Sequence, residues 1–265
     1  MKKSIFLLLQ GLVFSLPINF AVLAINNTSD GEMVTVKSPA NKVAVLELYT
    51  SEGCSSCPPA DTFLNELKNS GISDNKIIPM AFHVTYWDYI GWKDRFASKR
   101  FDARQRDIAR KARVNSVYTP QFVLDGKDFR NYSRFNKSVD AIVDEKATVD
   151  LSLTVEQKVD EVHLRLSSDI SATGLGDVGI YYAVLEDNLS SDVDDGENEG
   201  VHLYHNYVVR KLSVPYLQSK PNMEIEQLHV IKLDPMWKKS DLSIVAFAEN
   251  PHTGEVLQAV RYRYR

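Results

Sequence analysis

Two cysteines three positions apart stand between a mainly apolar segment and a pair of prolines. Residues 43–50 form the apolar segment, and Cys54 and Cys57 follow it after a short break. A run of this length and character is typical of a strand that is buried on both faces of a sheet. Pro58 and Pro59 come next and occupy positions where an α-helix can begin. The sequence therefore predicts that the cysteines lie at the junction of a buried strand and a helix.

The segment up to residue 148 continues the pattern of an α/β domain. In order, the elements predicted after the prolines are a helix ending near residue 71, a buried strand over 76–84, one or two inserted helices over 92–113, a strand over 121–124 and a helix over 133–146. A strand, a helix and a second strand in succession imply parallel strands with a right-handed crossover. The dipeptide Asp125-Gly126 predicts a tight hairpin after the 121–124 strand.

From residue 149 onward, apolar residues alternate with polar ones, as in strands that have one face in solvent. The alternating segments are 149–155, 162–166, 178–184 and 242–248. Several such strands separated by turns predict a mainly antiparallel, sandwich-like β domain. We therefore divide the chain into 1–24, a signal peptide; 25–40, a polar lead-in; 41–148, an α/β domain with inserted helices; and 149–265, the β domain.

The first 24 residues have the pattern of a secretory signal peptide. Lys2 and Lys3 precede an apolar stretch over residues 5–16, and small residues stand at the expected cleavage site after Ala24. The stretch is short and interrupted, which favours cleavage over retention as an anchor, and no later segment is apolar enough to span a membrane. We predict a periplasmic or secreted protein, a setting in which disulfides form and persist.

The charge of the chain argues against one class of partner. The formal net charge is −4, and loss of Lys2 and Lys3 with the signal peptide makes it −6 (−4 − 2). A mildly acidic protein has no electrostatic reason to bind nucleic acid, so we predict no such partner.

The position of the cysteines predicts thiol chemistry. At the start of a helix, unpaired N–H groups and the positive end of the helix dipole stabilise a thiolate. Cys54 would then be the nucleophile, and Cys57 would resolve the mixed disulfide. Two alternatives stay open, an inert structural disulfide and half of a zinc site. Zinc would need two more ligands, and the nearest candidate in the sequence, His83, stands alone.

Glu47 lies inside the predicted buried strand at residues 43–50. Carboxylates are rarely buried without a reason. A buried glutamate beside a dithiol could take the proton from Cys57, the resolving thiol. The alternative is an acid at a sheet edge or one paired to an arginine.

Pro120 is the second residue with a predicted role at the dithiol. In thioredoxin-like folds, a cis proline at the head of the corresponding strand faces the dithiol and presents backbone to the substrate. Pro120 stands directly before the 121–124 strand, which matches that position, and Thr119 precedes it. An ordinary trans turn proline is the alternative.

An aromatic segment follows the second buried strand. Ligand sites in open α/β sheets lie beyond the carboxyl ends of the strands. Trp87, Asp88 and Trp92 are therefore expected to line a substrate groove together with Thr119. The same aromatic residues could instead pack the inserted helices against the sheet.

Two features of the second half suggest metal binding but have simpler explanations. His202 and His205 have a usable spacing, yet on a strand their imidazoles face opposite sides. Residues 192–199 only partly match a calcium-binding loop and fit a solvated acidic loop better. Glu197 is expected to pair with Arg210. We predict no metal and no cofactor.

Several segments together resemble a known family. They are 47–61, 82–94, 104–106, 117–126, 196–200 and 205–210, and the block around Cys54-Ser-Ser-Cys57-Pro-Pro is the most specific of them. They are similar to the secreted, thioredoxin-like family known as domain of unknown function 1223. The resemblance implies a thioredoxin-like fold for residues 41–148, followed by the sandwich-like β domain. It implies no established activity.

We therefore expect an exported thiol–disulfide oxidoreductase in which Cys54 attacks, Cys57 resolves and Pro120 shapes the substrate surface. Its partners would be protein or small-molecule thiols and disulfides, with a membrane redox partner to renew its oxidation state. The competing hypothesis is a binding or structural module with an inert disulfide, which the absence of basic residues near Cys54 favours. A metal carrier that uses the dithiol is a third, weaker hypothesis.

Overall fold

The computed structural model describes residues 33–171 and 176–264. The predicted signal peptide and the first half of the polar lead-in, residues 25–32, lie outside the described residues. Among the residues that are described, no helix is long and apolar enough to cross a membrane.

The described part of the chain is rich in strands. Its helices are α1 (Pro58–Asn69), α2 (Lys99–Lys111) and α3 (Phe135–Val143), with 3-10 helices at Thr85–Ile90, Tyr132–Arg134 and Lys239–Asp241. The strands are β1 (Met33–Lys37), β2 (Ala44–Thr50), β3 (Ile77–His83), β4 (Gln121–Leu124), β5 (Lys127–Phe129), β6 (Val149–Gln157), β7 (Glu161–Ile170), β8 (Val178–Glu186), β9 (Leu189–Asp192), β10 (His202–His205), β11 (Val208–Leu212), β12 (Tyr216–Gln218), β13 (Ile225–Lys232), β14 (Leu242–Glu249) and β15 (Val256–Arg263). The predicted mixture of α and β structure is confirmed.

The largest sheet joins strands from both halves of the chain. Its order is β15-β14-β8-β11-β3-β2-β4-β5, with β12 paired to β8, and a second sheet has the order β1-β6-β7-β13. Strand β2 is parallel to β3, and β11 joins β3 in parallel through Val208 and Ala81. Strands on either side of residue 148 are thus hydrogen-bonded neighbours in one sheet, whereas the division of the chain into two domains at that residue stays a prediction.

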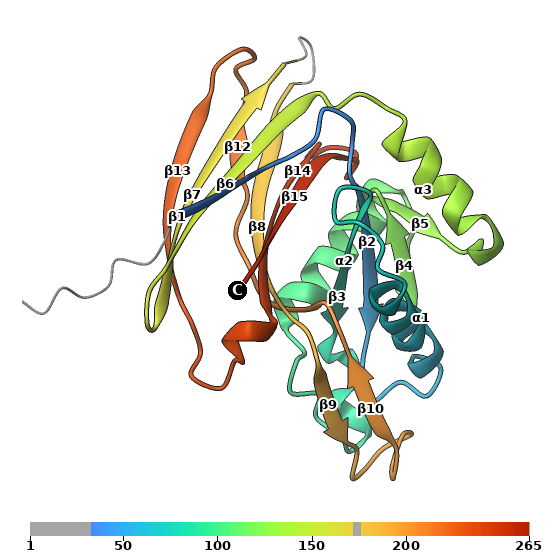
Figure 1. Ribbon diagram of the computed structural model, residues 1–265. Coiled ribbons are helices and arrows are strands. Elements are labelled where there is room, and N and C mark those ends of the chain that lie inside the picture. Colours follow the sequence, from blue (N-terminus) through green and yellow to red (C-terminus); the bar gives the residue numbers. More distant parts are fainter. Residues whose placement is uncertain (1–32, 172–175, 265) are drawn as a thin grey trace, which may run out of the picture. The chain divides into compact units, whose positions relative to one another are not determined.

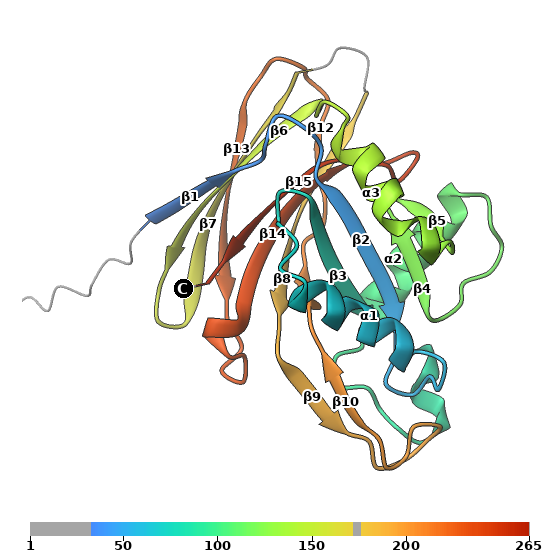
Figure 2. The same ribbon diagram turned by 45° about the vertical axis from the view of Figure 1, so that its right-hand side comes forward.

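Helices α1 and α3 and the second sheet cover one face of the large sheet over different strands, and helix α2 covers the other face (Figures 1 and 2). Helices α1 and α3 pack on one face of β2, β3 and β4 around Leu46, Leu48 and Phe122. Helix α2 covers the other face through Phe101 and Ile108. Strands β6, β7 and β13 of the second sheet pack against β8, β14 and β15 and enclose a separate apolar core.

One prediction about the second half is partly wrong. Strands β6 and β7 alternate between buried and more exposed residues, as predicted. Strand β14 is buried at every position, and β8 is buried at all positions but one. The reason is that these strands extend the large sheet, so that the second sheet covers one of their faces, while the other contacts Phe101 and Ile108 of α2.

A two-stranded hairpin projects from the body of the sheets beside α1 (Figures 1 and 2). It consists of β9 and β10, paired antiparallel from Asp192 opposite His202 to Leu189 opposite His205. The Asn65 side chain of α1 donates a hydrogen bond to the Tyr204 carbonyl (3.0 Å) and holds the hairpin to the helix. The loop at the tip of this hairpin, residues 193–201, is therefore carried to the start of α1.

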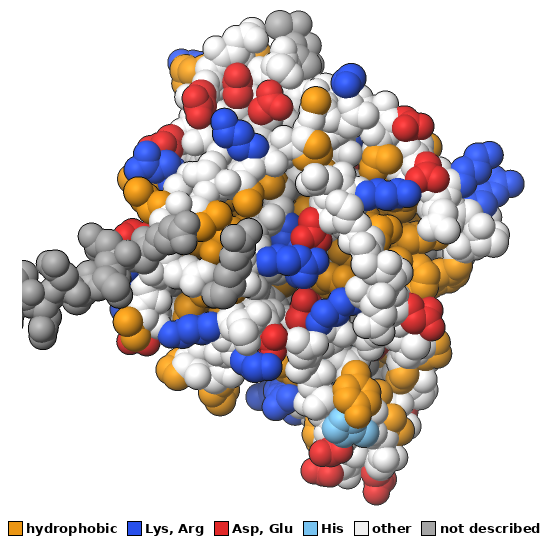
Figure 3. All heavy atoms as spheres, in the orientation of Figure 1, with side chains coloured by type: hydrophobic (Ala, Val, Ile, Leu, Met, Phe, Trp, Pro, Cys, Tyr) orange, Lys and Arg blue, Asp and Glu red, His pale blue; other side chains and the backbone are white. Residues whose placement is uncertain are grey.

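The surface carries charges of both signs. On the face drawn in Figure 3, basic and acidic side chains are interspersed. The absence of a nucleic-acid partner stays a prediction that rests on the acidic net charge.

Candidate functional site

Cys54 and Cys57 form a disulfide at the predicted junction between β2 and α1. Cys57 stands at the N-cap position of α1, and Pro58 opens the helix. Proline is accepted there because the first N–H groups of a helix have no partner within the helix. Neither cysteine has any exposed surface. The pair thus sits at the positive end of α1, beneath the surface of the protein.

The segment before β4 lies against the Cys54 sulfur. Strand β4 runs antiparallel to β2 with Tyr49 opposite Gln121, which places the residues before β4 beside the end of β2. The Thr119–Pro120 peptide bond is cis, as predicted. The Thr119 hydroxyl donates to Cys54 Sγ at 3.3 Å, and the Ser56 hydroxyl lies 3.4 Å from the same sulfur. Two hydroxyl groups therefore lie within hydrogen-bonding distance of Cys54 Sγ, the predicted nucleophile.

The aromatic segment lies beside the dithiol loop. Trp87 donates its indole N–H to the Thr119 hydroxyl (2.7 Å), and Trp92 donates its own to Glu52 Oε2 (2.8 Å). Asp88 accepts a long hydrogen bond from the Asp94 N–H (3.4 Å), and burial raises the pKa of the Asp88 carboxyl. The three predicted groove residues of this segment are half-buried and hydrogen-bonded within the protein, and the fourth, Thr119, is the partner of Trp87. Their role as a substrate surface stays a prediction.

A groove of about 570 Å³ borders the dithiol on another side. It is lined mainly by apolar side chains of α1, by Tyr132 and by Pro120, and Ser56 of the dithiol motif forms its edge. Of the residues predicted to shape a substrate surface, only Pro120 lines it. Helix α1 contributes Pro59 and Phe63 to the groove, and neither is among the residues predicted to shape a substrate surface.

Glu47 is buried but faces away from α1. Both of its carboxylate oxygens accept hydrogen bonds from Arg104 of α2, at 2.8 and 2.6 Å, and Tyr49 donates a third at 2.7 Å. Tyr49 belongs to the apolar cluster on the α2 side of the sheet, whereas Leu46 and Leu48 belong to the cluster under α1. Because side chains alternate along a strand, Glu47 shares the face of Tyr49. The contacts match the alternative weighed from the sequence, an acid paired to an arginine.

Other buried carboxylates lie under the dithiol loop. Glu52 has no exposed surface, and its Oε1 lies 3.2 Å from His205 Nε2. Burial raises the pKa of Glu52, but hydrogen bonds with His205, Ser191 and Trp92 together outweigh it, and the net shift of the pKa is downward. The Glu52 N–H donates to Asp94 Oδ2 (3.0 Å), and the same oxygen lies 2.6 Å from His83 Nδ1. Burial opposes ionisation of Asp94, yet His83 holds the pKa of that carboxyl below its usual range.

The two buried histidines reach this region from distant parts of the chain. His83 ends β3, and His205 ends β10 more than a hundred residues later. Burial lowers the pKa of His205, but the carboxylates of Asp61 and Glu52 outweigh it and raise the pKa to about 10. His202 points outward to Asp192, so the prediction that His202 and His205 face opposite sides is confirmed. The sequence alone did not place His205 beside His83.

The loop at the tip of the β9–β10 hairpin closes over the dithiol motif. Glu197 accepts hydrogen bonds from the Ser55 N–H (3.1 Å) and hydroxyl (2.7 Å). The buried Asn198 amide donates to the carbonyls of Glu52 (2.7 Å) and Cys54 (3.1 Å).

The predicted pairing of Glu197 with Arg210 is wrong. Arg210 Nε lies 3.5 Å from Glu186, and its guanidinium stacks over the Phe96 ring, whereas Glu197 contacts Ser55. The hairpin turns the loop toward α1 and away from β11, where Arg210 lies.

The chain belongs to the family described as "Protein of unknown function (DUF1223)", whose family model matches residues 45–249. The resemblance seen in the sequence is thus confirmed at the level of the family. A search of the curated proteins found no match.

The solved structures that resemble the chain include two for which the likeness covers most of it. The protein AGR_C_4864 from Agrobacterium tumefaciens is 24% identical, with a TM-score of 0.61; the likeness covers 85% of this chain and 96% of that one. HBP35 of Porphyromonas gingivalis is 15% identical, with a TM-score of 0.64; the likeness covers 86% of this chain and 76% of that one. At these identities the likeness bears on the fold alone.

Proposed function

We propose that the protein is an exported thiol–disulfide oxidoreductase whose redox centre is the Cys54–Cys57 pair in a thioredoxin-like arrangement. The observation that carries the proposal is the surroundings of Cys54 Sγ, which combine the start of α1 with hydroxyl groups of Thr119 and Ser56. These groups stabilise negative charge on the sulfur, and the thiolate is the form of cysteine that attacks disulfides. Export rests on the signal-like pattern of residues 1–24.

The proposed reaction exchanges one disulfide for another. In the reduced protein, the Cys54 thiolate attacks a substrate disulfide, forms a mixed disulfide and releases one substrate sulfur as a thiolate. Cys57 then loses its proton to solvent and attacks Cys54 Sγ, which releases the second substrate thiolate. The substrate disulfide is reduced by two electrons, and the Cys54–Cys57 disulfide is formed. Reversal of the same steps oxidises a substrate dithiol.

The groove beside Ser56 and Pro120 supports protein substrates. It is mostly apolar and large enough for side chains that flank a substrate cysteine. Thr119 and Pro120 lie between this groove and Trp87, so backbone at this point can meet an extended peptide. A membrane protein that renews the oxidation state of the dithiol remains part of the proposal.

One observation favours a second candidate, a binding or structural module with an inert disulfide. Both cysteines lack exposed surface, and Glu197 and Asn198 hold the loop over the dithiol motif. Catalytic disulfides need access to one sulfur, whereas structural ones do not.

The reduction potential of the Cys54–Cys57 pair decides between the two candidates. Equilibration of the purified protein with glutathione redox buffers, followed by thiol trapping and mass spectrometry, measures it. We expect a value between about −270 and −120 mV, the range of thioredoxin-fold oxidoreductases. A value below about −300 mV is typical of structural disulfides and would overturn the oxidoreductase proposal.

Thr119→Val is expected to raise the pKa of the Cys54 thiol by about 1 to 2 units. The substitution removes the hydroxyl that donates to the Cys54 sulfur while it keeps the shape of the side chain. A hydrogen bond to a charged group contributes about 1.5–3 kcal/mol, and each pKa unit corresponds to about 1.4 kcal/mol. Thiolate absorbance in the reduced protein measures the pKa. Thr119→Ser keeps the hydroxyl and serves as the control. An equal pKa in both variants would show that the contact does not stabilise the thiolate.

A further inference from the structure

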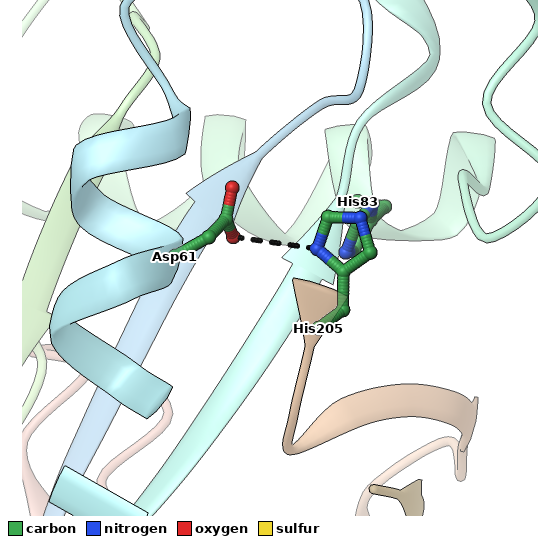
Figure 4. Close-up of side chains that lie close together, drawn as sticks. All are labelled: Asp61, His83 and His205. Atoms are coloured by element: carbon green, nitrogen blue, oxygen red, sulfur yellow. Dashed lines mark ion pairs between the residues drawn. The ribbon is translucent and has the colours of Figure 1, made fainter. Parts of the chain in front are cut away.

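Asp61, His83 and His205 meet in the interior beneath the dithiol loop (Figure 4). They come from the first turns of α1, the end of β3 and the end of β10. One atom from each, a carboxylate oxygen or an imidazole nitrogen, lies within 4.8 Å of the other two. Asp61 is 7% exposed, His83 is fully buried and His205 is 2% exposed. The three side chains point toward one another in a space closed to solvent.

Each histidine is held by a carboxylate on its outer nitrogen. His83 Nδ1 lies 2.6 Å from Asp94, and His205 Nε2 lies 3.2 Å from Glu52. The inner nitrogens, His83 Nε2 and His205 Nδ1, have no hydrogen-bond partner within the described structure. This is the arrangement of metal-binding histidines, in which a carboxylate fixes the ring and the free nitrogen faces the ion.

When both rings carry their hydrogen on the outer nitrogen, as metal binding requires, the inner nitrogens present bare lone pairs. They face the carboxylate of Asp61, whose Oδ1 lies 3.8 Å from His205 Nδ1. Three electron-pair donors then surround one buried space with no hydrogen between them. Such a set is unfavourable in a protein interior unless positive charge occupies the space.

The net charge of the region also favours a bound cation. Glu52, Asp61 and Asp94 supply three carboxylates, and all three are buried. In the form that binds a metal, the two histidines are neutral and supply no positive charge. One divalent cation would reduce the sum from −3 to −1 and would satisfy both inner nitrogens.

We propose that Asp61, His83 and His205 bind a zinc ion. Two imidazole nitrogens and one carboxylate oxygen suit zinc, whereas calcium and magnesium prefer oxygen ligands alone. Two zinc ligands at about 2.0–2.1 Å and tetrahedral angles lie about 3.4 Å apart, so small movements of the side chains would close the site. The proposal departs from the expectation that the chain binds no metal, and it does not rest on the proposed thiol chemistry.

The zinc ion would join three distant parts of the chain. It would tie α1, which carries the dithiol at its start, to β3 and to the β9–β10 hairpin whose loop holds Ser55. The site would therefore fix the position of the hairpin over the dithiol loop. Glu52 and Asp94 would act as positioning residues through His205 and His83.

The rival occupant of the space is a pair of protons. Protonation of both histidines gives the same sum of charge, −1, as one divalent cation bound to neutral rings. Zinc retention against a chelator separates the two, because a site with high zinc affinity releases its protons when the ion binds, whereas a site that protons alone stabilise loses zinc to the chelator.

The test uses the full chain in its oxidised form, so that the cysteines are not available as ligands. The protein is stripped with a chelator, loaded with zinc chloride, and dialysed against buffer that contains a weak chelator. Elemental analysis then gives the zinc content, and X-ray absorption spectroscopy gives the ligands. We expect one zinc per chain with nitrogen and oxygen ligands at about 2.0–2.2 Å and no sulfur.

Three variants complete the test. Asp94→Asn, which alters a positioning contact, is expected to weaken zinc binding by about 10- to 100-fold. His205→Gln removes a ligand and is expected to weaken it more. His202→Gln changes the exposed histidine of the same strand and should leave binding unchanged. Absence of retained zinc in the unaltered protein, sulfur at about 2.3 Å in its ligand shell, or equal losses in His202→Gln and His205→Gln would overturn the proposal.

Discussion

Replacement of Arg104 by methionine is expected to destabilise the protein by about 3–5 kcal/mol, because it leaves the buried Glu47 carboxylate without its cationic partner and removes one of the two cationic partners of Glu249. The Arg104 guanidinium contacts Glu47 and Glu249, and each of these residues is 1% exposed. It also stacks over the rings of Phe82, Tyr181 and Phe247, so its stem and charge are both enclosed. Urea unfolding followed by circular dichroism measures the free energy of unfolding.

Two further variants test the cause of this loss. Arg110→Met changes an exposed arginine of the same helix, paired to Asp107, and should cost less than about 1 kcal/mol. Glu47→Met combined with Arg104→Met removes both members of a buried pair. The double variant should be more stable than Arg104→Met alone, because fewer buried charges are left unpaired. Equal losses for Arg110→Met and Arg104→Met would contradict the role given to the buried pair.

The Arg104–Glu47 pair could be predicted only in part from the sequence. Glu47 was notable because an acid within an apolar strand needs a partner, and an arginine was one of the partners considered. Whether Glu47 contacts the Cys57 thiol or an arginine depends on which face of β2 its side chain occupies. That face is set by the register of β2 with β3 and β4 and by the helix that covers it, and both depend on contacts between distant segments.

More of the structure around the dithiol could be predicted, because the sequence patterns that indicate it are local. The apolar run before Cys54, the prolines after Cys57 and the Thr119–Pro120 step each fix backbone geometry within a few residues. The parallel pairing of β2 and β3 and the hairpin at Asp125-Gly126 follow from the same local patterns. Both residues of that hairpin have positive φ angles, 47° and 79°, as a tight turn of this kind requires.

The histidine cluster and the hairpin loop could not be predicted in this way. His83 was recognised but lacked a neighbour, because His205 approaches it from a strand 122 positions later in the sequence (205 − 83). The sequence predicts a solvated acidic loop at residues 192–199, yet Asn198 is buried and donates a hydrogen bond to the Cys54 carbonyl. One signal was present in the sequence: a histidine at the end of a strand that is otherwise apolar needs a polar partner in the interior.

Cys57→Ser is expected to trap the protein as a mixed disulfide through Cys54. With the resolving thiol absent, attack of Cys54 on glutathione disulfide releases one glutathione thiolate and leaves the other glutathione bound to the protein. The adduct should accumulate to about one glutathione per chain, since no second thiol of the described chain can displace it. Intact-protein mass spectrometry over time measures both the extent and the rate of the reaction.

Cys54→Ser provides the matched comparison, because it leaves a single cysteine in the same motif. Cys57 stands at the N-cap of α1, and neither the Thr119 hydroxyl nor the Ser56 hydroxyl is hydrogen-bonded to its sulfur within the described structure. We therefore expect Cys54→Ser to react with glutathione disulfide only at the background rate of an ordinary buried thiol. Similar adduct formation in both variants would mean that the hydroxyl groups do not select a nucleophile. Absence of an adduct in Cys57→Ser under native conditions would mean that the hairpin loop keeps substrates from Cys54, and the inert-disulfide module would then be the better description of the protein.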